Sequence, residues 1–407
     1  MRYGGDLGSF LHHRDDPRLK FPLTQKSRRI ALEFFTEVEC GKHRDERDQS
    51  SLIPDSRRYS LLYPDEGESP MGSFSRRTLG KTGLQVSPLG IGGGGGISDA
   101  DLLYAFDKGI NYFFFSADLH HWLYQKSAQA LKALCGHGST VRDQVVLATV
   151  TYLSNPEKIV GTLLDVIMEL GIDYIDVFHW GWVTDDDNLA PLLTCAHQLQ
   201  EDNQLTGTLR YYQKVRDLAS AQSKESEMEL RFRQQQERQE IAQEVNNDLI
   251  RRGLVRYVGA SFHSRQAARR SLHDLDVLML RYNIAHTGAE QDIVPFLEGN
   301  KEHDPGIVVF NTAHCGGLFF PMPPQGYVRD RYIPSFADCY RFALSNSWVD
   351  LVLAGLSNRQ QIDMALEALE KGPLSEQECA SLRDYGRLFS PENSGTQKKD
   401  IESWSWN

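Results

Sequence analysis

The sequence lacks the features that mark membrane, secreted and nucleic-acid-binding proteins. Its 407 residues contain no long apolar run, so no transmembrane helix is expected, and the amino terminus has no apolar segment of a secretory signal. The six cysteines are scattered without a CxxC pair, which favours reduced thiols in a cytoplasmic protein. A net charge of −11 argues against a nucleic-acid partner, because such proteins usually present a basic surface.

Residues 1–70 differ in composition from the rest of the chain. They are polar and mixed in charge, and Pro54, Pro64 and Pro70 with acidic residues between them are typical of a linker. Met71 begins a segment of different character. Two interpretations stay open: residues 1–70 are an extension that does not belong to the protein, or they form a flexible arm. At the other end, residues 391–407 are expected to form a C-terminal tail.

Residues 71–390 show the pattern of a barrel. After Arg77, a Lys-Thr-Gly turn between two short alternating segments indicates a β-hairpin. Eight apolar runs then alternate with helical patterns, as expected for parallel strands covered by helices. Eight such units predict an α/β fold, the (β/α)8 TIM barrel, with an N-terminal β-hairpin. The expected strands are residues 89–93, 111–116, 145–150, 174–180, 255–261, 277–282, 307–312 and 349–354.

Capping signals place several of the helices. Ser98 begins a helix that ends in a basic turn at Gly109. Pro156 stands in the first turn of another helix, which ends at Gly171. The pair Ser357-Asn358 opens the helix that follows the last strand.

One connection is much longer than a barrel helix requires. Between strands four and five, the chain from about residue 185 to 252 is charged, rich in glutamine and has widely spaced apolar residues. This pattern predicts an extended helical insertion over residues 200–250. Two roles stay open: a solvated insertion without function, or a docking surface for a protein partner or a lid.

Six segments in order resemble the aldo-keto reductase family, from about Arg77 to Arg387. They include RTLGKTGLQVSPLGIG at the hairpin and first strand, DKGINYFFFSAD at the second strand and LGIDYID before the fourth. LIRRGLVRYVGAS, RYNIAHTGAEQDIVPFLE and FALSNSWVDLVLAGLSNRQQIDMALEALEKGPLSEQE complete the series. The resemblance implies hydride transfer between a nicotinamide cofactor and a carbonyl compound. A tyrosine, a lysine, an aspartate and a histidine then form the catalytic tetrad of that reaction.

The tetrad positions are replaced in this chain. By the resemblance, the tyrosine falls on His120, the aspartate on Phe115 and the lysine on Val150. The histidine falls on Gly181 in the ungapped match, or on His179 with a two-residue slip. General acid catalysis therefore needs another proton donor.

The cofactor positions are partly retained. Ser261 matches the serine that contacts the nicotinamide carboxamide, and Gly92 begins a glycine run where the family places its cofactor. The phosphate-binding pattern fits Gly355, Ser357, Asn358 and Gln361, with Arg359 able to meet the 2′-phosphate of NADP. Other positions depart from the family pattern: Phe262, Met279, Thr312, Met364 and Ala365.

Several reactive side chains follow the predicted strands, at the end where barrel active sites lie. Imidazole titrates near neutrality, so His120 could replace the tyrosine as proton donor with Asp118 as its activating partner. We predict His120, Asp118 and His179 as catalytic residues. The alternative is that these histidines line a cavity or pack on Trp122 and Trp180. The histidines lack the HxH or HExxH spacing, so no metal site is expected.

Two hypotheses for function remain. The first is an aldo-keto-reductase-like oxidoreductase that uses NADP(H) on a small carbonyl or related substrate, with a non-standard proton donor. The second is a catalytically inactive barrel that binds a nucleotide or a protein partner through residues 200–250. The replaced tetrad favours the second hypothesis, and the retained frame and phosphate segment favour the first.

Overall fold

The computed structural model describes residues 74–116, 124–153, 156–201, 253–313, 318 and 334–389. The predicted eight strands and the hairpin lie within these residues. The segment 1–70, nearly all of the insertion 200–250 and the tail 391–407 lie outside them, so their predicted roles stay predictions.

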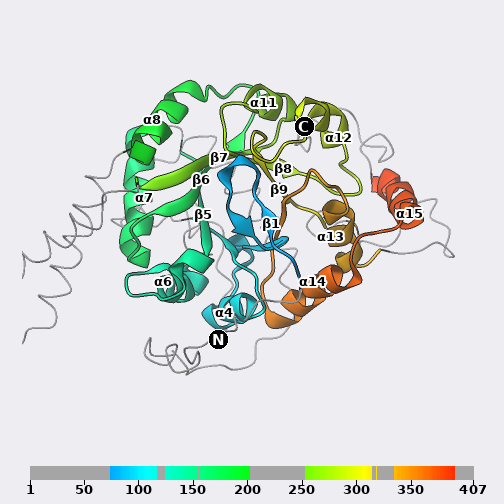
Figure 1. Ribbon diagram of the computed structural model, residues 1–407, viewed down its shortest axis with the longest axis horizontal. Helices are drawn as coiled ribbons and strands as arrows, with labels where there is room; N and C mark the ends of the chain where they lie inside the picture. The colour runs from blue at the N-terminus through cyan, green and yellow to red at the C-terminus, as the bar shows by residue number, and fades with distance from the viewer. Residues whose placement is uncertain are drawn as a thin grey trace, which may run out of the picture. The chain divides into compact units, whose positions relative to one another are not determined.

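Eight parallel strands close into a barrel in the order β10-β3-β4-β5-β6-β7-β8-β9 (Figure 1). The predicted (β/α)8 barrel is confirmed, with each boundary within a few residues of the expected one. The strands are β3 (Leu89–Gly92), β4 (Tyr112–Phe115), β5 (Val146–Thr151), β6 (Ile175–Val183), β7 (Val255–Phe262), β8 (Val277–Arg281), β9 (Gly306–Phe310) and β10 (Leu351–Ala354).

The strands are continuous apolar runs because both of their faces are covered. Every residue of β4, β5 and β10 is buried, one face against the barrel interior and the other against the helices. The helices lie around the strands in Figure 1. They are α4 (Asp99–Asp107), α6 (Ala128–Cys135), α7 (Pro156–Leu170), α8 (Ala190–Glu201), α11 (Arg265–Arg270), α12 (Ala289–Asp292), α13 (Phe336–Leu344), α14 (Arg359–Lys371) and α15 (Glu376–Gly386).

The helices begin and end where the capping signals predict. The Ser98 side chain accepts a hydrogen bond from the N–H of Asp101 at the start of α4, and Gly109 after its end has a φ of 93°. Pro156 is the first residue of α7, and Gly171 after its end has a φ of 64°. Asn358 caps α14.

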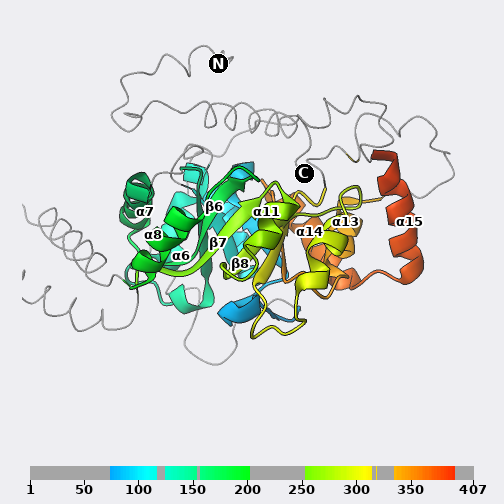
Figure 2. The same cartoon turned by 90° about the horizontal axis from the view of Figure 1, so that it is seen from above.

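The predicted hairpin closes the amino end of the barrel. Its strands β1 (Arg77–Thr78) and β2 (Gln85–Val86) pair antiparallel, and its turn packs on Gly306, where β9 begins. The Arg77 guanidinium donates to the carbonyls of Val349 (2.9 Å) and Leu344 (3.1 Å), which precede β10. Figure 1 shows β1 over the middle of the barrel. Figure 2 shows the hairpin, in blue, at one end of the barrel, opposite to the end where the strands finish.

Carboxylates make the same type of hydrogen bond at the amino ends of three strands, two of them buried (Asp176 and Asp350) and one partly exposed (Asp276). In each case an aspartate within the first two residues of a strand, or just before it, accepts a backbone N–H from the neighbouring strand. The bonds are Leu147 N–H to Asp176 (2.9 Å), Val258 N–H to Asp276 (3.0 Å) and Ile307 N–H to Asp350 (2.9 Å). Arginine or lysine compensates the two most buried charges. Asp176 pairs with Arg142 at 2.8 Å and with Arg256 at 2.9 Å, and Asp350 pairs with Lys301.

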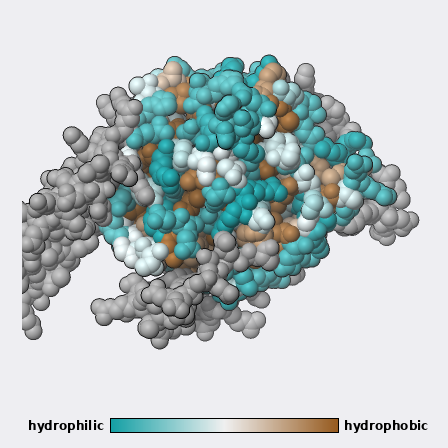
Figure 3. All heavy atoms as spheres, viewed as in Figure 1, coloured by the Kyte–Doolittle hydropathy of each residue, from teal (hydrophilic) through white to brown (hydrophobic). Residues whose placement is uncertain are grey.

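The described surface gives no sign of a membrane span. On the face in Figure 3, hydrophilic residues cover most of the described area and hydrophobic residues lie scattered between them. Within the described ranges, no helix is long and apolar enough to cross a bilayer.

Candidate functional site

The carboxyl ends of the strands, which we call the barrel mouth, contain the strained backbone of the described chain. Trp182 in β6 (φ 63°) and Asn311 after β9 (φ 56°) are its two non-glycine residues with positive φ. Trp182 lies where the register of β6 against β7 shifts, between Trp180 and Val183. Strained residues of this kind concentrate at functional sites, because the surrounding structure must hold them in place. The barrel mouth is therefore the first place to look for function.

Three of the positions that the resemblance gives to the catalytic tetrad are apolar here. Phe115 and Val150 are buried, at 0% and 1% exposure, in β4 and β5. Gly181 in β6 has no side chain, and a Cβ added there would overlap the ring of Tyr152, which occupies the space. The described residues thus place no lysine, aspartate or histidine at these three positions.

His179 lies inside the barrel, in register with Val150 on β5 and Gly259 on β7. Its Nε2 lies 3.2 Å from the Tyr112 hydroxyl, and the imidazole is fully buried. Burial lowers the pKa of His179 to about 3, so the ring is neutral at pH 7. A Cβ at position 259 would lie 2.6 Å from Nδ1 of His179, which explains the glycine there. The catalytic role predicted for His179 stays a prediction, in a setting that favours a neutral interior group.

The other two predicted catalytic residues, Asp118 and His120, lie outside the described residues, in the segment 117–123 that follows β4. Their roles stay predictions.

Ser261, predicted to contact the carboxamide, lies at the barrel mouth near the end of β7. Its hydroxyl oxygen accepts the backbone N–H of Trp182 at 3.0 Å. The indole of Trp182 packs on the ring of His263, with 4.3 Å between ring centroids, and His263 meets Phe310 edge-on at 5.8 Å. Ser261 therefore helps to hold the strained Trp182, and its hydroxyl still has a proton to donate.

The predicted glycines of the cofactor site lie beside each other. Gly92 ends β3, whose neighbour β10 ends one residue before Gly355. A Cβ on Gly95 would lie 3.1 Å from the carbonyl oxygen of Gly355, so the glycine run after β3 packs against this segment. A Cβ on Gly355 would meet nothing within 4 Å. A ligand can therefore approach the backbone closely at Gly355.

The phosphate pattern predicted at the start of α14 forms one compact unit. Asn358 caps the helix by accepting the N–H of Gln361 at 3.0 Å. Ser357 donates both its backbone N–H (2.8 Å) and its hydroxyl (3.0 Å) to the side-chain oxygen of Gln361. Two donors of one residue thus converge on a single oxygen atom, an arrangement that also suits a phosphate oxygen.

Arg359 stands at the first position of α14 with 56% of its side chain exposed. Its guanidinium stacks on the ring of Tyr104 from α4, with 4.3 Å to the ring centroid, and its Nε lies 3.8 Å from Asp101. Tyr104 is fixed in turn by donating its hydroxyl to Asp363 at 2.6 Å. A planar cation is thus held at the amino end of a 13-residue helix.

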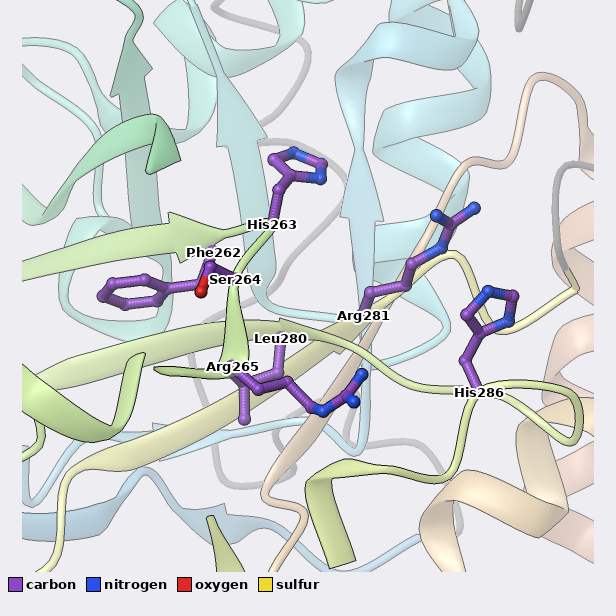
Figure 4. A pocket seen from close by; sticks show the side chains of 7 residues that line it. All are labelled: Phe262, His263, Ser264, Arg265, Leu280, Arg281 and His286. Carbon is purple, nitrogen blue, oxygen red and sulfur yellow. The ribbon is translucent and has the colours of Figure 1, made fainter. Parts of the chain in front are cut away.

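Sequence reasoning missed the arginines at the mouth. Arg281 is the last residue of β8, and Arg265 is the first residue of α11; with His263 and His286 they line a pocket between the ends of β7 and β8 (Figure 4). The signal was present in the sequence, because an arginine ends the apolar run VLMLR of a predicted strand. Ends of barrel strands are where such residues have functional meaning.

Comparisons with known proteins connect this fold to aldo-keto reductases. No family model and no curated protein matches the sequence. Among solved structures, the chain is similar to an aldo-keto reductase from Bacillus halodurans in its holo form, with a TM-score of 0.54 and 20% identity over 77% of this chain and 96% of that one. It is also similar to an aldo/keto reductase from Klebsiella pneumoniae in complex with NADP and acetate. That match has a TM-score of 0.50 and 14% identity over 78% of this chain and 97% of that one. The chain thus shares the aldo-keto reductase fold.

Proposed function

We propose that the chain binds NADP(H) at the barrel mouth and is an oxidoreductase of the aldo-keto reductase type that acts on a small carbonyl compound. The main support is the start of α14, where Arg359, the paired donors of Ser357 and the open position at Gly355 lie together. The Klebsiella relative of the same fold was solved with NADP.

The residues at the start of α14 fit the phosphate end of this cofactor. The first N–H groups of a helix have no intrahelical acceptor, and the partial positive charge at this end favours an anion. Arg359 adds a full charge and a planar fork for the 2′-phosphate that distinguishes NADP from NAD. The stack on Tyr104 orients this fork in advance.

The residues predicted to hold the nicotinamide end of the cofactor fit it less completely. Ser261 retains a hydroxyl proton for the carboxamide oxygen, but the neighbouring Phe262 and Met279 are buried and offer no hydrogen bond of the kind that the resemblance places there. Bound NADPH would supply a hydride for a carbonyl carbon. The chain must then supply the proton to the carbonyl oxygen.

We assign this proton to His120, with Asp118 as its partner. Phe115, Val150 and Gly181 have no proton to give, and the buried imidazole of His179 is neutral at pH 7 because its pKa lies near 3. Imidazole is the side-chain group that ordinarily changes its charge near neutral pH, which suits a general acid at physiological pH.

A second candidate function is favoured by the same apolar tetrad positions. It is a catalytically inactive barrel that binds a nucleotide, or a protein partner through residues 200–250. Where this barrel binds the nucleotide, the two candidates agree on NADPH binding and differ on turnover.

A fluorescence titration of the purified chain with NADPH and with NADH tests the common part. We expect NADPH to bind at least tenfold more tightly than NADH, because only NADPH has the phosphate for Arg359. Absence of binding at millimolar NADPH would refute the oxidoreductase and the nucleotide-binding form of the inactive barrel.

Oxidation of NADPH in the presence of short aldehydes and ketones separates the two candidates. His120→Ala should reduce turnover at least a hundredfold without changing the affinity for NADPH. His303→Ala, at an exposed position before β9, is the matched control and should retain wild-type turnover. NADPH binding without turnover on any tested carbonyl would favour the inactive barrel.

A further inference from the structure

Tyr104 lies at the contact between α4 and α14, beside the phosphate end of the proposed cofactor site. Its ring carries the guanidinium of Arg359 at 4.3 Å from the ring centroid, and its hydroxyl donates to Asp363 at 2.6 Å. Both partners belong to α14, whereas Tyr104 belongs to α4. One side chain outside the predicted phosphate pattern thus contacts both charged residues in the first two turns of α14.

The guanidinium of Arg359 is held in place while its hydrogen-bond donors stay available. Its Nε lies 3.8 Å from Asp101, which is close enough for an ion pair but longer than a hydrogen bond. The other oxygen of this carboxylate accepts from the Ser98 hydroxyl at 2.8 Å. Within the described part of the chain, the contacts of the guanidinium are this ion pair and the stack on Tyr104. Its N–H groups can therefore be donated to a phosphate.

Asp363 is well placed to neutralise Arg359. It stands four residues after Arg359 in α14, and side chains at this spacing are neighbours on one face of a helix. A carboxylate paired with Arg359 would occupy the N–H groups that a phosphate needs. Asp363 accepts the Tyr104 hydroxyl instead. This bond raises the pKa of Tyr104 above its usual value, so the hydroxyl stays protonated and continues to donate at neutral pH.

We propose that Tyr104 sets the preference of the site for NADP(H) over NAD(H), as a positioning residue that acts through Arg359. Its ring holds the guanidinium plane at the start of α14, and its hydroxyl keeps Asp363 from pairing with that guanidinium. This role rests on the proposed function, because it presupposes that the 2′-phosphate binds at Arg359.

Fluorescence titrations of Tyr104→Leu with NADPH and with NADH test this role. Leucine removes both the ring and the hydroxyl, so we expect the affinity for NADPH to fall about fivefold. The affinity for NADH should stay within about twofold of the wild type, because NADH has no phosphate for Arg359, and this binding also shows that the variant is folded. Equal losses for the two cofactors would mean that Tyr104 only supports the local structure, and would overturn the proposal.

The same substitution in an Arg359→Gln background tests whether Tyr104 acts through Arg359. Tyr104→Leu should then change the affinity for NADPH by less than about 1.5-fold, because the residue that it positions is already absent. A further fivefold loss in this background would show that Tyr104 acts independently of Arg359, and would also overturn the proposal.

Tyr104→Phe isolates the hydroxyl. It keeps the ring and releases Asp363 to pair with Arg359, so we expect the affinity for NADPH to fall about two- to threefold. Addition of Asp363→Asn removes the released charge and should restore the wild-type affinity. Asp363→Asn alone should bind NADPH at least as tightly as the wild type, because the amide oxygen still accepts the Tyr104 hydroxyl. A loss that persists in the double variant would overturn the role assigned to the hydroxyl.

Lys108→Met is the matched control. Its ammonium also lies over the Tyr104 ring, 5.3 Å from the centroid, but Lys108 stands at the end of α4 instead of the start of α14. The substitution removes the same charge as Arg359→Gln, yet both cofactor affinities should remain those of the wild type. If it lowered the affinity for NADPH as much as Tyr104→Leu does, the charge around the ring would set the preference, and the proposal would fail.

The wild-type titration separates this role from the proposed function. No binding of NADPH by the wild type would refute the proposed function, and the role of Tyr104 with it. The same preference for NADPH in the wild type and in Tyr104→Leu would support the cofactor site and overturn the role of Tyr104 alone.

Discussion

The two ends of the barrel differ in how their polar groups are satisfied. At the amino end, buried aspartates receive backbone N–H groups of neighbouring strands, and arginine or lysine compensates Asp176 and Asp350. At the carboxyl end, Trp182 and Asn311 hold positive φ angles, and arginines and histidines line a pocket. In barrel enzymes, residues at the amino end generally contribute to stability, and residues at the carboxyl end contribute to the chemistry. Substitutions at the two ends should therefore affect different measurements.

The largest expected effect lies at the amino end. Asp176→Ala would leave Arg142 without its carboxylate partner in a largely buried position and remove the acceptor for the N–H of Leu147. Loss of one partner of a buried ion pair typically costs about 3–5 kcal/mol. We expect a decrease of this size in the free energy of unfolding by urea.

Asp185→Ala at the mouth is the comparison for this measurement. Its side chain is half exposed and pairs with an exposed arginine, so the cost should stay near or below about 1 kcal/mol. If Asp176→Ala and Asp185→Ala lost equal free energy of unfolding, the two ends of the barrel would not differ in their contribution to stability.

The second prediction concerns pH and the interior between the two ends. In the unfolded chain, an imidazole binds a proton below about pH 6.5. In the folded chain, burial lowers the pKa of His179 to about 3. The stability that depends on the neutral ring is thus fully present above pH 6.5 and is lost as the pH falls toward 3. Between these values the loss is roughly 1.4 kcal/mol for each pH unit.

His179→Leu removes this dependence. Between pH 7 and pH 5, we expect the free energy of unfolding of the variant to fall by about 1–2 kcal/mol less than that of the wild type. Tyr112→Phe retains the buried imidazole and removes only its hydroxyl partner, so it should show the same acid sensitivity as the wild type. Parallel pH curves for His179→Leu and the wild type would show that His179 is protonated equally in the folded and unfolded states.

The same contrast explains how much the sequence could predict. The strands, the hairpin and the caps at Ser98 and Asn358 follow from local patterns, and the structure confirms them. The resemblance also predicts that Phe115, Val150 and either Gly181 or His179 stand at the family's catalytic positions, and this stays a prediction. All of these features depend on residues that are close in sequence or on a matched series of motifs.

The geometry of the mouth could not be predicted in this way. The engagement of Ser261 with the N–H of Trp182 joins residues 79 positions apart and depends on the irregular register of β6. The pocket around Arg281 needs the end of β7, the end of β8 and the turn at His286 in one place. Such features follow from strand register and barrel closure, which no single segment specifies.

The third prediction compares two arginines of the mouth. Arg359→Gln removes the charge and the stacked fork at the start of α14, so it should weaken NADPH binding about tenfold, or about 1.4 kcal/mol, and NADH binding much less. Arg281→Met, at the end of β8, should leave the affinity for NADPH unchanged. Fluorescence titrations of both variants measure this, and weaker NADPH binding by Arg281→Met alone would contradict the phosphate site proposed at α14.

The smallest expected effect tests the strain at the mouth itself. Asn311 has a φ of 56°, where alanine costs about 1–2 kcal/mol and glycine costs little. Asn311→Ala and Asn311→Gly both lack the amide side chain, so the difference between them isolates the backbone. We expect the glycine variant to be more stable by about 1 kcal/mol in urea unfolding. Asn346, which follows α13 and has no positive φ, should show the opposite order, because glycine there only adds freedom to the unfolded chain. If alanine were the more stable variant at both positions, Asn311 would not be strained, and the mouth would then lose one of the two features that distinguish its backbone from the amino end.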